Sequence, residues 1–402
     1  MRIGIDVRCL SDGRRTGVEE YTLNLLSNLF EMDRRNEYVL FFNSYRKTGA
    51  DFSWIGKYPN VTLKKFNYPN KLLNFLFWYF NWPKIDKMIG GPASTRGGDR
   101  SSTRGGVDIV FMPNIIFGSV SKDSKLVVTL HDLSFERYPE TFSWKRRLWH
   151  LFVNPKSICR KADRIIAVSE STKNDIANLY GIDSNKIRMI HSGLSEKFAP
   201  VDRNNAKLIQ TKEKYDLPYK FILYLGTIEP RKNIAGLVRA FNELQKMAAE
   251  KKLEEILRHK LVIAGSSGWL SKEIFEEIEY SQAKDKIMVI NFVEDADKEY
   301  VFNLASLFVY PSLFEGFGFP PLEAMACGVP VVASNNSSLP EIMGQGGVMV
   351  DPHKPDEIAK AMFEILTDVK LREALIQKGK AQAAKFDWQK TAEEFLKVIN
   401  KI

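Results

Sequence analysis

Short apolar runs rich in Val and Ile alternate with longer segments of helical periodicity along most of the 402-residue chain. Between the first two runs, Val18, Tyr21 and Leu25 recur at the spacing of an amphipathic helix over residues 18–30. Strands of this composition that alternate with helices favour parallel sheets covered on both faces. The predicted strands are residues 2–7, 38–42, 61–66, 108–112, 125–130, 164–168, 186–190, 221–225, 261–264, 287–290, 307–310, 329–333 and 348–350.

The alternation stops at the polar stretch 198–217, which we interpret as a domain boundary. We therefore expect an α/β protein with an N-terminal domain over 1–198 and a C-terminal domain over 199–380. A last helical segment, 381–402, can pack back on the N-terminal domain. Two doubly wound domains of similar size would leave a cleft that the carboxyl ends of their strands face.

Residues 90–106 have a composition unlike the rest of the chain. The pentapeptide Ser-Thr-Arg-Gly-Gly occurs twice there, and no apolar residue is larger than Ala or Pro. Burial cannot offset the entropy cost of ordering such a segment, so a flexible loop is predicted, either native or engineered. An arginine–glycine tether for nucleic acid is disfavoured because no aromatic residue is interleaved to stack on bases.

Composition limits the classes of protein that fit. Hydrophobic residues make up 44% of the chain and charged residues 27%, as in ordinary globular proteins. The three cysteines show no metal or disulfide spacing, and the first residues read as a strand rather than a signal peptide, so a cytoplasmic protein is expected. The net charge of +9 attracts phosphates, nucleic acid or anionic lipid without choosing among them.

The strongest chemical signal is residues 310–330, which read as strand, glycine loop, helix and strand. Gly316 and Gly318 let the backbone approach a ligand, and the amino end of the helix offers N–H groups to an anion. Glu315 and Glu323, separated by seven residues, can accept hydrogen bonds from sugar hydroxyls. One glutamate alone would be read as a complement to the helix dipole, but the pair around a Gly-x-Gly loop favours a binding site.

Two further positions carry candidate chemistry. Arg231 and Lys232 follow a strand and open a helix, where adjacent cations can neutralise a leaving diphosphate; without that context a solvated helix start would be the preferred interpretation. His131 stands at the carboxyl end of the strand 125–130, the edge at which ligands bind in open α/β sheets. A lone histidine at a strand end is more often structural.

The Glu315–Glu323 stretch resembles the E-x7-E motif of the retaining GT-B glycosyltransferases, and of glycosyltransferase family 4 in particular. The likeness runs from Met1 to about Asp351 and weakens between residues 68 and 106. Other stretches that resemble the family, in the family's order, are 15–18, 131–134, 168–173, 225–233 and 261–265.

The resemblance implies a GT-B fold with two Rossmann-like domains that face each other across a cleft. The N-terminal domain would bind the acceptor and the C-terminal domain the nucleotide sugar. It implies a GDP- or UDP-linked sugar as donor, with Arg231 and Lys232 on the phosphates, His131 and Glu315 on the sugar, and neither metal nor other cofactor. The loop at Gly17 would close over the phosphates and the acceptor. Residues implied to bind the donor are Gly17, Gly316, Phe317, Gly318, Phe319, Leu322 and Glu323.

The chain departs from the family pattern at three places. Thr227 stands where many members carry an arginine, so one phosphate contact is missing or replaced. His191 stands where relatives usually have an Asn-Gly pair. Asp295 and Asp297 form an Asp-x-Asp, which holds a metal in the other glycosyltransferase fold; here it precedes a helix, so the helix-cap interpretation is preferred.

A membrane surface is a further candidate partner. Nine large apolar side chains fall within residues 72–82, between Lys71 and Lys84, and residues 144–150 form a second basic, aromatic stretch. Such segments suit a peripheral helix at an anionic bilayer, here the inner face of the cell membrane. A helix buried against the first sheet is the equal alternative.

These observations together lead us to expect a retaining, metal-independent glycosyltransferase. It would move a sugar, by resemblance mannose, to a saccharide or lipid-linked saccharide in the synthesis of cell-surface polysaccharide or glycolipid. No nucleic acid is expected as a partner. A nucleotide-sugar epimerase of the same fold and a non-enzymatic binder of membrane or nucleic acid remain as alternatives.

Overall fold

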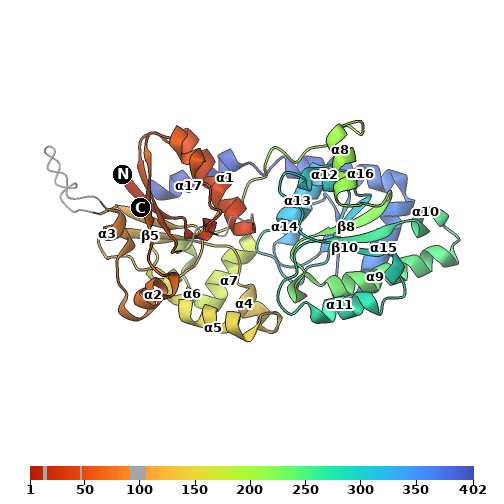
Figure 1. Cartoon of the computed structure of the whole chain (residues 1–402), viewed down its shortest axis with the longest axis horizontal. Coiled ribbons are helices and arrows are strands. Elements are labelled where there is room, and N and C mark those ends of the chain that lie inside the picture. Colours follow the sequence, from red (N-terminus) through yellow and green to blue (C-terminus); the bar gives the residue numbers. More distant parts are fainter. Residues whose placement is uncertain (12–15, 46–47, 91–105) are drawn as a thin grey trace. The chain divides into compact units, whose positions relative to one another are not determined.

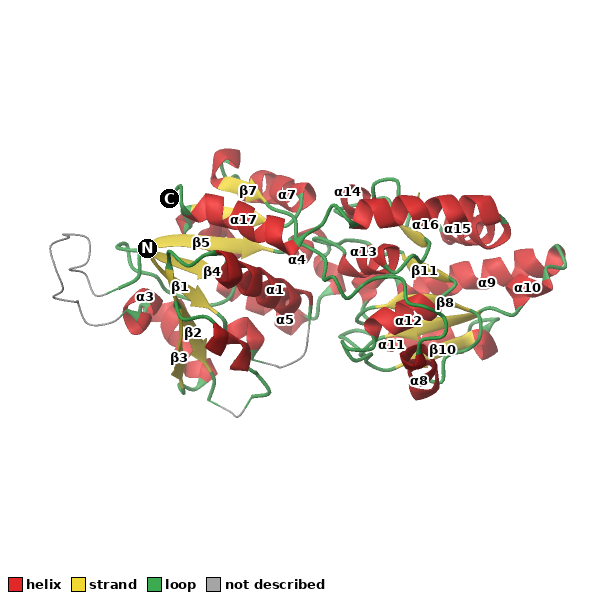
Figure 2. Cartoon of the chain, turned by 90° about the horizontal axis from the view of Figure 1, so that it is seen from above, coloured by secondary structure: helices red, strands yellow, loops and turns green. Residues whose placement is uncertain are grey.

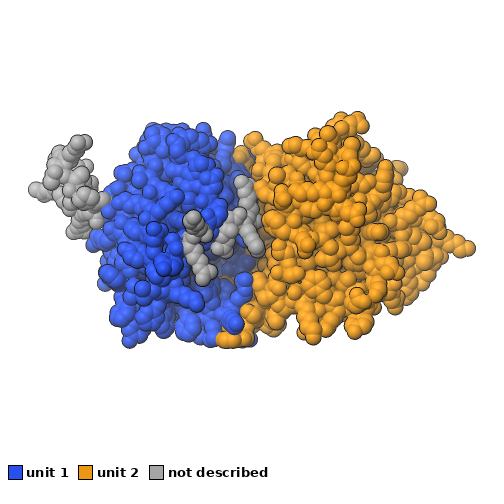
Figure 3. Space-filling view, viewed as in Figure 1, with its two compact units in different colours: residues 1–133, 145–193, 388–402 blue, residues 134–144, 194–387 orange. Residues whose placement is uncertain are grey.

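The computed structural model describes residues 1–11, 16–45, 48–90 and 106–402, which form two compact units (Figure 3). Unit 1 consists of Met1–Leu133, Lys145–Gly193 and Trp388–Ile402, and unit 2 of Ser134–Trp144 and Leu194–Asp387. The units therefore divide at Gly193 rather than at residue 198. The predicted flexible loop 90–106 lies almost entirely outside the described residues.

Unit 1 is built on a seven-stranded parallel sheet with the order β3-β2-β1-β4-β5-β6-β7. The order reverses direction between β1 and β4, which creates a crevice at their carboxyl ends. The strands are β1 (Arg2–Asp6), β2 (Glu37–Asn43), β3 (Val61–Phe66), β4 (Ile109–Met112), β5 (Lys125–Leu130), β6 (Arg164–Ala167) and β7 (Ile187–Met189).

Unit 2 repeats the same winding on a six-stranded parallel sheet with the order β10-β9-β8-β11-β12-β13. Its strand order reverses direction between β8 and β11, the switch point at which such sheets form a crevice. The strands are β8 (Phe221–Leu225), β9 (Lys260–Ala264), β10 (Ile287–Ile290), β11 (Leu307–Tyr310), β12 (Val331–Ser334) and β13 (Val348–Val350). Every strand predicted from the apolar runs is confirmed, with ends that shift by at most two residues.

Helices cover both faces of each sheet (Figures 1 and 2). The described part of the chain contains no helix with the length and hydrophobicity needed to cross a bilayer. The helices are α1 (Gly17–Met32), α2 (Asn70–Phe75), α3 (Ile85–Ile89), α4 (Ser134–Arg137), α5 (Trp144–Val153), α6 (Pro155–Lys161), α7 (Glu170–Tyr180), α8 (Ala206–Lys214), α9 (Ile234–Glu250), α10 (Glu254–Leu257), α11 (Lys272–Glu279), α12 (Lys298–Leu304), α13 (Phe319–Ala326), α14 (Leu339–Met343), α15 (Pro355–Thr367), α16 (Val369–Ala383) and α17 (Trp388–Ile399).

The last helix, α17, completes the core of unit 1. Trp388 meets Tyr21 of α1 edge-on with ring centroids 5.9 Å apart, and Phe395 packs on Phe111 of β4 at 4.5 Å. The Thr391 hydroxyl donates to the His191 carbonyl at 2.8 Å, so His191 lies at this seam of unit 1. Residues 381–387 of the predicted terminal segment remain with unit 2.

Conversely, residues 134–144 come from the first half of the sequence but belong to unit 2. The Trp269 indole N–H donates to the Thr141 carbonyl at 2.6 Å, and the Trp269 ring stacks on Phe142. Tyr138 also packs against Phe314, which follows β11. Neither the charge nor the periodicity of residues 134–144 indicates that they belong to unit 2.

The stretch 198–217 is not a plain linker. It contains α8, whose last turn is bound to the start of α12: the Tyr215 hydroxyl and the Lys214 ammonium both donate to Asp297, at 2.8 and 2.7 Å. The stretch is polar because the exposed face of a short helix is polar. The sequence pattern alone does not distinguish a polar linker from a short surface helix.

Candidate active site

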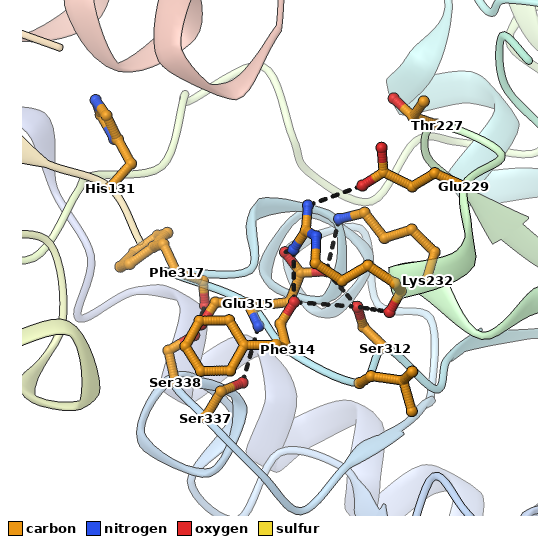
Figure 4. Close-up of polar contacts among 12 residues, drawn as sticks. His131, Thr227, Glu229, Lys232, Ser312, Phe314, Glu315, Phe317, Ser337 and Ser338 are labelled. Carbon is orange, nitrogen blue, oxygen red and sulfur yellow. Dashed lines mark hydrogen bonds and ion pairs between the residues drawn. The ribbon is translucent and has the colours of Figure 1, made fainter. Parts of the chain in front are cut away.

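The predicted phosphate residues lie at the crevice of unit 2, because the loops that follow β8 and β11 meet there (Figure 4). The loop after β8 carries Arg231 and Lys232 in a single 3₁₀ turn, and the loop after β11 carries Glu315. The Leu313 N–H donates to the Arg231 carbonyl at 2.8 Å, which joins the two loops directly.

Lys232 and Glu315 form a buried ion pair. The Lys232 ammonium donates to the Glu315 carboxylate at 2.6 Å and to the Tyr310 hydroxyl at 2.8 Å. The Ser312 hydroxyl donates to the same carboxylate oxygen at 2.5 Å. Lys232 is only 8% exposed, so the interpretation of this segment as a solvated helix start is wrong.

Arg231 extends this pair into a cluster of four charges. Its guanidinium donates to the other Glu315 oxygen at 3.2 Å, to the Glu229 carboxylate at 2.9 Å and to the Phe314 carbonyl at 2.5 Å. Two cations thus face two carboxylates, and the cluster is formally neutral. The sequence indicated both cations and Glu315, but neither their direct pairing nor the participation of Glu229.

The protonation states follow from burial and pairing. Burial alone would raise the pKa of Glu315, but the adjacent Lys232 and Arg231 charges, with the Ser312 hydrogen bond, lower it to about 2. Burial and the Arg231 charge lower the pKa of Lys232, against the opposing effect of Glu315 and Glu229. At neutral pH the carboxylate of this pair is therefore ionised.

The glycine loop leads into α13, which begins at Phe319. Gly318 has φ of 107°, a conformation that L side chains rarely adopt, and a Cβ there would lie 2.8 Å from Leu339. Phe317 and Leu322 are buried, and Phe317 packs on Phe319 at 5.0 Å. The backbone conformation of Gly318 and the packing of Phe317 therefore hold the glycine loop in one conformation.

Glu323 is buried and is the fifth residue of α13, beyond its first turn. The helix dipole acts within the first turn, so the position of Glu323 does not support the interpretation that it only complements the dipole. The helix begins at Phe319, immediately before Pro320 and Pro321, which places Glu323 one turn further along.

Two serines support the loop and were missed in the sequence. The Glu315 N–H donates to the Ser337 hydroxyl at 2.9 Å, and the Ser338 hydroxyl donates to the Glu315 and Phe317 carbonyls at 3.0 and 2.8 Å. Both serines follow β12, the strand next to β11, and so arrive at the same sheet edge. That position is the signal that would have identified them.

The remaining candidates, His131 and Gly17, belong to unit 1. The His131 Nε2–H donates to the Pro113 carbonyl at 2.8 Å, and its ring meets Tyr21 edge-on at 4.8 Å. Burial lowers the pKa of His131, so the ring is neutral at pH 7 and its Nδ1 is an acceptor. Gly17 is the first residue of α1; residues 12–15 of its loop lie outside the described residues.

Asp295 and Asp297 are engaged with lysines. Lys197 and Lys298 approach Asp295 at 2.6 and 3.2 Å, while Asp297 accepts from Lys214. Asp297 occupies the predicted N-cap position of α12. Its side chain does not form the capping hydrogen bond to the first turn, so that part of the prediction is wrong. Among the described residues no group of three or more His, Cys, Asp or Glu could hold a metal ion.

Thr227 is exposed, and its carbonyl accepts a hydrogen bond from the Tyr224 hydroxyl at 3.1 Å. Its side chain cannot supply the charge of the arginine expected there. The positive charge of this loop is carried by Arg231 and Lys232, which follow Thr227.

Comparison with known proteins identifies two family models that together span most of the chain. Residues 15–198 match the model described as Glycosyltransferase Family 4, and residues 206–382 match Glycosyl transferases group 1. The two matches correspond closely to the two halves of the sequence that carry the two sheets.

Individual relatives agree with the family models. O-antigen chain mannosyltransferase B of Escherichia coli is 35% identical over 266 residues, which are 66% of this chain and 67% of that protein. Serotype-specific mannosyltransferase WbdA of Escherichia coli is 35% identical over 276 residues, or 67% of this chain. Those residues are 32% of WbdA, so the chain matches about a third of that relative's length.

Among solved structures, HepE of Anabaena in complex with UDP-glucose has a TM-score of 0.70 at 16% sequence identity, with all of both chains covered. At this identity the likeness concerns the fold alone. The fold is the two-domain GT-B fold that the resemblance implied.

We predict that Glu315→Gln destabilises unit 2 by about 3–5 kcal/mol at pH 7, because it leaves two buried cations facing one fewer carboxylate. A depressed carboxyl pKa stabilises the fold above its ordinary value of 4.5, and this stabilisation is lost as pH falls toward about 2. The native chain should therefore lose more stability than the variant between these pH values. Denaturant unfolding across this range measures both effects.

The matched control is Glu279→Gln in the exposed Lys284–Glu279 pair of the same unit. It should leave the free energy of unfolding nearly unchanged. Equal unfolding curves for the native chain and the Glu315 variant would show that the buried pair contributes no net stability.

Proposed function

Because the chain belongs to glycosyltransferase family 4, we propose that it transfers mannose from a nucleoside diphosphate sugar, with retention of anomeric configuration and without a metal ion. The proposed acceptor is a saccharide or lipid-linked saccharide of a cell-surface polysaccharide. The relatives named as O-antigen mannosyltransferases support the sugar and the pathway class. Their sugar favours GDP-mannose as donor over the UDP-glucose bound to HepE.

The observation that carries the proposal is the buried, formally neutral charge cluster at the crevice between β8 and β11. In doubly wound sheets ligands bind at this switch point. Of the three N–H groups of the Lys232 ammonium, two donate to Glu315 and Tyr310, which leaves one for a phosphate oxygen among the described contacts. The cations are thus held in place before a donor arrives.

The proposed mechanism assigns the leaving diphosphate to Arg231, Lys232 and the amino end of α13. As the bond between the anomeric carbon and the phosphate oxygen breaks, negative charge develops on the diphosphate, and fixed cations stabilise it more than mobile ones. Glu323 would hold the ribose of the nucleoside. Glu315, ionised by its neighbours, would orient the transferred sugar by accepting a hydroxyl.

No carboxylate is assigned as a nucleophile, and Glu315 already accepts hydrogen bonds from Lys232, Arg231 and Ser312. We therefore propose that the acceptor hydroxyl attacks on the face from which the diphosphate leaves, and that its proton passes to the departing phosphate oxygen. The neutral His131 imidazole suits a hydrogen bond with a sugar hydroxyl. The contact of His131 with the transferred sugar stays a prediction.

The direct experiment supplies GDP-mannose with and without a mannose-containing acceptor and follows release of GDP and the configuration of the product. Transfer that depends on the acceptor and retains the α-configuration supports the proposal. Conversion of the donor without an acceptor would indicate an epimerase instead. A thermal-shift series with GDP and UDP identifies the base, since a bound ligand raises the melting temperature by mass action.

Replacing Arg231 and Lys232 together by Ala is expected to weaken GDP binding and slow transfer at least roughly tenfold, since a hydrogen bond to a charged group contributes about 1.5–3 kcal/mol. Calorimetric binding and steady-state rates measure the two effects. A charge-matched variant, Glu229→Gln with Arg231→Gln, keeps the cluster neutral and separates lost binding from lost folding. Lys272→Ala, on the surface of unit 2, is the control. If the variant with Ala at both Arg231 and Lys232 transfers sugar at the native rate, neither cation takes part in the site.

Chelation is expected to leave transfer unchanged, because cationic side chains and helix N–H groups take the place of a metal on the diphosphate. The measurement is the initial rate in EDTA and after addition of Mg²⁺ or Mn²⁺. Loss of activity in EDTA that either ion restores would contradict the metal-independent mechanism and would return Asp295 and Asp297 to consideration as ligands.

We also propose that unit 1 contacts an anionic membrane through an aromatic surface made of two segments. The first is residues 70–82, which comprise α2, the π-helical turn that follows it and Trp82. Leu73 and Phe77 are buried, Leu76 is half-buried, and the other large side chains of this segment are exposed. The second is α5, whose Phe152 meets Trp78 edge-on at 5.2 Å and joins the two segments. The exposed aromatic residues of the first segment are Phe75, Trp78, Tyr79, Phe80 and Trp82.

The buried alternative for residues 72–82 holds for Leu73 and Phe77 alone, while the exposed side chains of the segment are the basis of the proposed membrane contact. Lys145, Arg146 and Arg147 are exposed on α5, the helix that contacts this segment through Phe152. Cations next to exposed aromatic side chains match the chemistry of an anionic bilayer surface, where each adds about 1 kcal/mol.

Replacing Trp78, Tyr79 and Phe80 by Ser is expected to abolish sedimentation with anionic liposomes at low salt while the chain stays folded, because all three are exposed. Phe77 is left intact since it is buried. The control replaces the exposed Tyr219 and Tyr280 of unit 2 by Ser. The native chain should bind less as salt increases. Equal binding by the variant, or no binding by the native chain, would contradict this proposal.

A further inference from the structure

Residues 134–144, which we call the strap, belong to unit 2 and have no role in the proposed mechanism. The strap contains α4 and a 3₁₀ turn at Pro139–Thr141. The Tyr138 N–H donates to the Ser134 carbonyl at 2.8 Å, and the Thr141 hydroxyl donates to the Tyr138 carbonyl at 2.7 Å. These hydrogen bonds give the strap a defined shape of its own.

One end of the strap packs on the loop that carries Glu315. The Tyr138 ring lies 5.9 Å from the ring of Phe314, which is buried. The Phe314 carbonyl accepts a hydrogen bond from the Arg231 guanidinium at 2.5 Å. Because packed side chains transmit a displacement to their neighbours, a shift of Tyr138 would move an acceptor that holds Arg231.

The other end of the strap packs on the loop that follows β9. The Trp269 indole N–H donates to the Thr141 carbonyl at 2.6 Å, and the Trp269 ring stacks on Phe142 at 5.6 Å. Thr141 and Phe142 are both buried. A single side chain makes both contacts, so Trp269 anchors this end of the strap.

The loop after β9 is in turn fixed to the loop after β8. The Ile228 N–H donates to the Ser266 carbonyl at 3.0 Å, and the Gly268 N–H donates to the Ile228 carbonyl at 2.8 Å. The two backbones approach so closely that a Cβ on Gly268 would lie 3.0 Å from the Ile228 carbonyl oxygen. The next residue is Trp269 in one loop and Glu229 in the other, so the positions of these two residues are tied together.

These contacts form a closed cycle that includes Arg231. The Glu229 carboxylate accepts from the guanidinium at 2.9 Å, on the opposite side of the cycle from the Phe314 carbonyl. The strap joins these two acceptors, through Trp269 to the first and through Tyr138 to the second. A guanidinium that is held in place before a ligand arrives loses less side-chain entropy on binding. The Arg231 side chain is 13% exposed, so part of it remains accessible.

We infer that the strap positions Arg231 for the diphosphate of the donor, with Tyr138 and Trp269 as the positioning residues. The inference rests on the proposed transferase function and adds a segment of the chain to its phosphate site. Neither residue is assigned a contact with the donor, since each acts through an acceptor that holds the guanidinium. The strap is encoded in the first half of the sequence, so the phosphate site draws on both halves.

The test measures binding of GDP, UDP, guanosine and uridine to the full chain by calorimetry. The variants are Tyr138→Ala and Trp269→Ala, with Tyr138→Phe and Trp269→Phe as conservative changes that keep an aromatic ring. The alanine variants should bind the nucleoside diphosphate about fivefold or more weakly and the nucleoside unchanged, because a charged hydrogen bond to phosphate depends on its geometry. Tyr138→Phe should restore native affinity, and Trp269→Phe, which lacks the indole N–H, should restore it in part.

Combination with Arg231→Gln separates positioning from a general loss of stability. In that background the alanine changes should cost no further diphosphate affinity, because residues that act through one group are not additive. The control Phe363→Ala removes a buried ring of α15 that contacts Lys251, just beyond the carboxyl end of α9. It should lower the melting temperature without changing the ratio of diphosphate affinity to nucleoside affinity.

NMR of the arginine side-chain nitrogens adds a measurement that needs no ligand. The signals of Arg231 are identified by their loss in Arg231→Gln. In the native chain the hydrogen bonds to Glu229 and Phe314 should restrict rotation of the guanidinium and keep its two Nη signals separate. In Tyr138→Ala and Trp269→Ala the two signals should merge.

Separate Nη signals in every variant, additive losses in the Arg231→Gln background, or equal losses of nucleoside and diphosphate affinity would overturn the inference. The proposed function can fail separately. A native chain that binds neither GDP nor UDP, but whose Arg231 signals merge in the alanine variants, would contradict the proposed function and leave the action of the strap on Arg231 intact.

Discussion

The buried pair between Lys232 and Glu315 is the interaction on which the arrangement of unit 2 depends. Its two members come from loops that follow neighbouring parallel strands, so forming the pair fixes both loops at once. Tyr310, Ser312 and Arg231 then complete the hydrogen bonds of the two charged groups. A buried charge pair is seldom a net source of stability compared with apolar packing. Its retention here is consistent with a site that must present cations in a dry crevice.

The regular parts of the fold could be predicted because one physical rule governs them. Strands buried on both faces are continuously apolar, as the central strands of both sheets are. All thirteen predicted runs are strands among the described residues, although β3, β7 and β10 are only partly buried. The glycine loop and the cations of the candidate site were predicted for a related reason: their positions follow directly from the ends of such strands.

The rest could not be predicted because it depends on contacts between residues distant in sequence. Nothing local to Glu229 or Ser337 indicates that they meet Arg231 or Glu315. The exchange of residues 134–144 into unit 2 depends on Trp269, which is more than a hundred residues away. The two sides of residues 72–82 were ambiguous because a short apolar run has the same composition whether one side or both are covered.

The membership of α17 in unit 1 has a consequence for the order in which the chain can fold during synthesis. Trp388 and Phe395 fill the core beside Tyr21 and Phe111, which the ribosome makes several hundred residues earlier. All of unit 2 is made before α17, so the second unit in the sequence is the first whose residues are all available. Until α17 emerges, the growing chain carries an N-terminal sheet with part of its apolar face open to water, and chaperones that recognise such surfaces have their longest opportunity there.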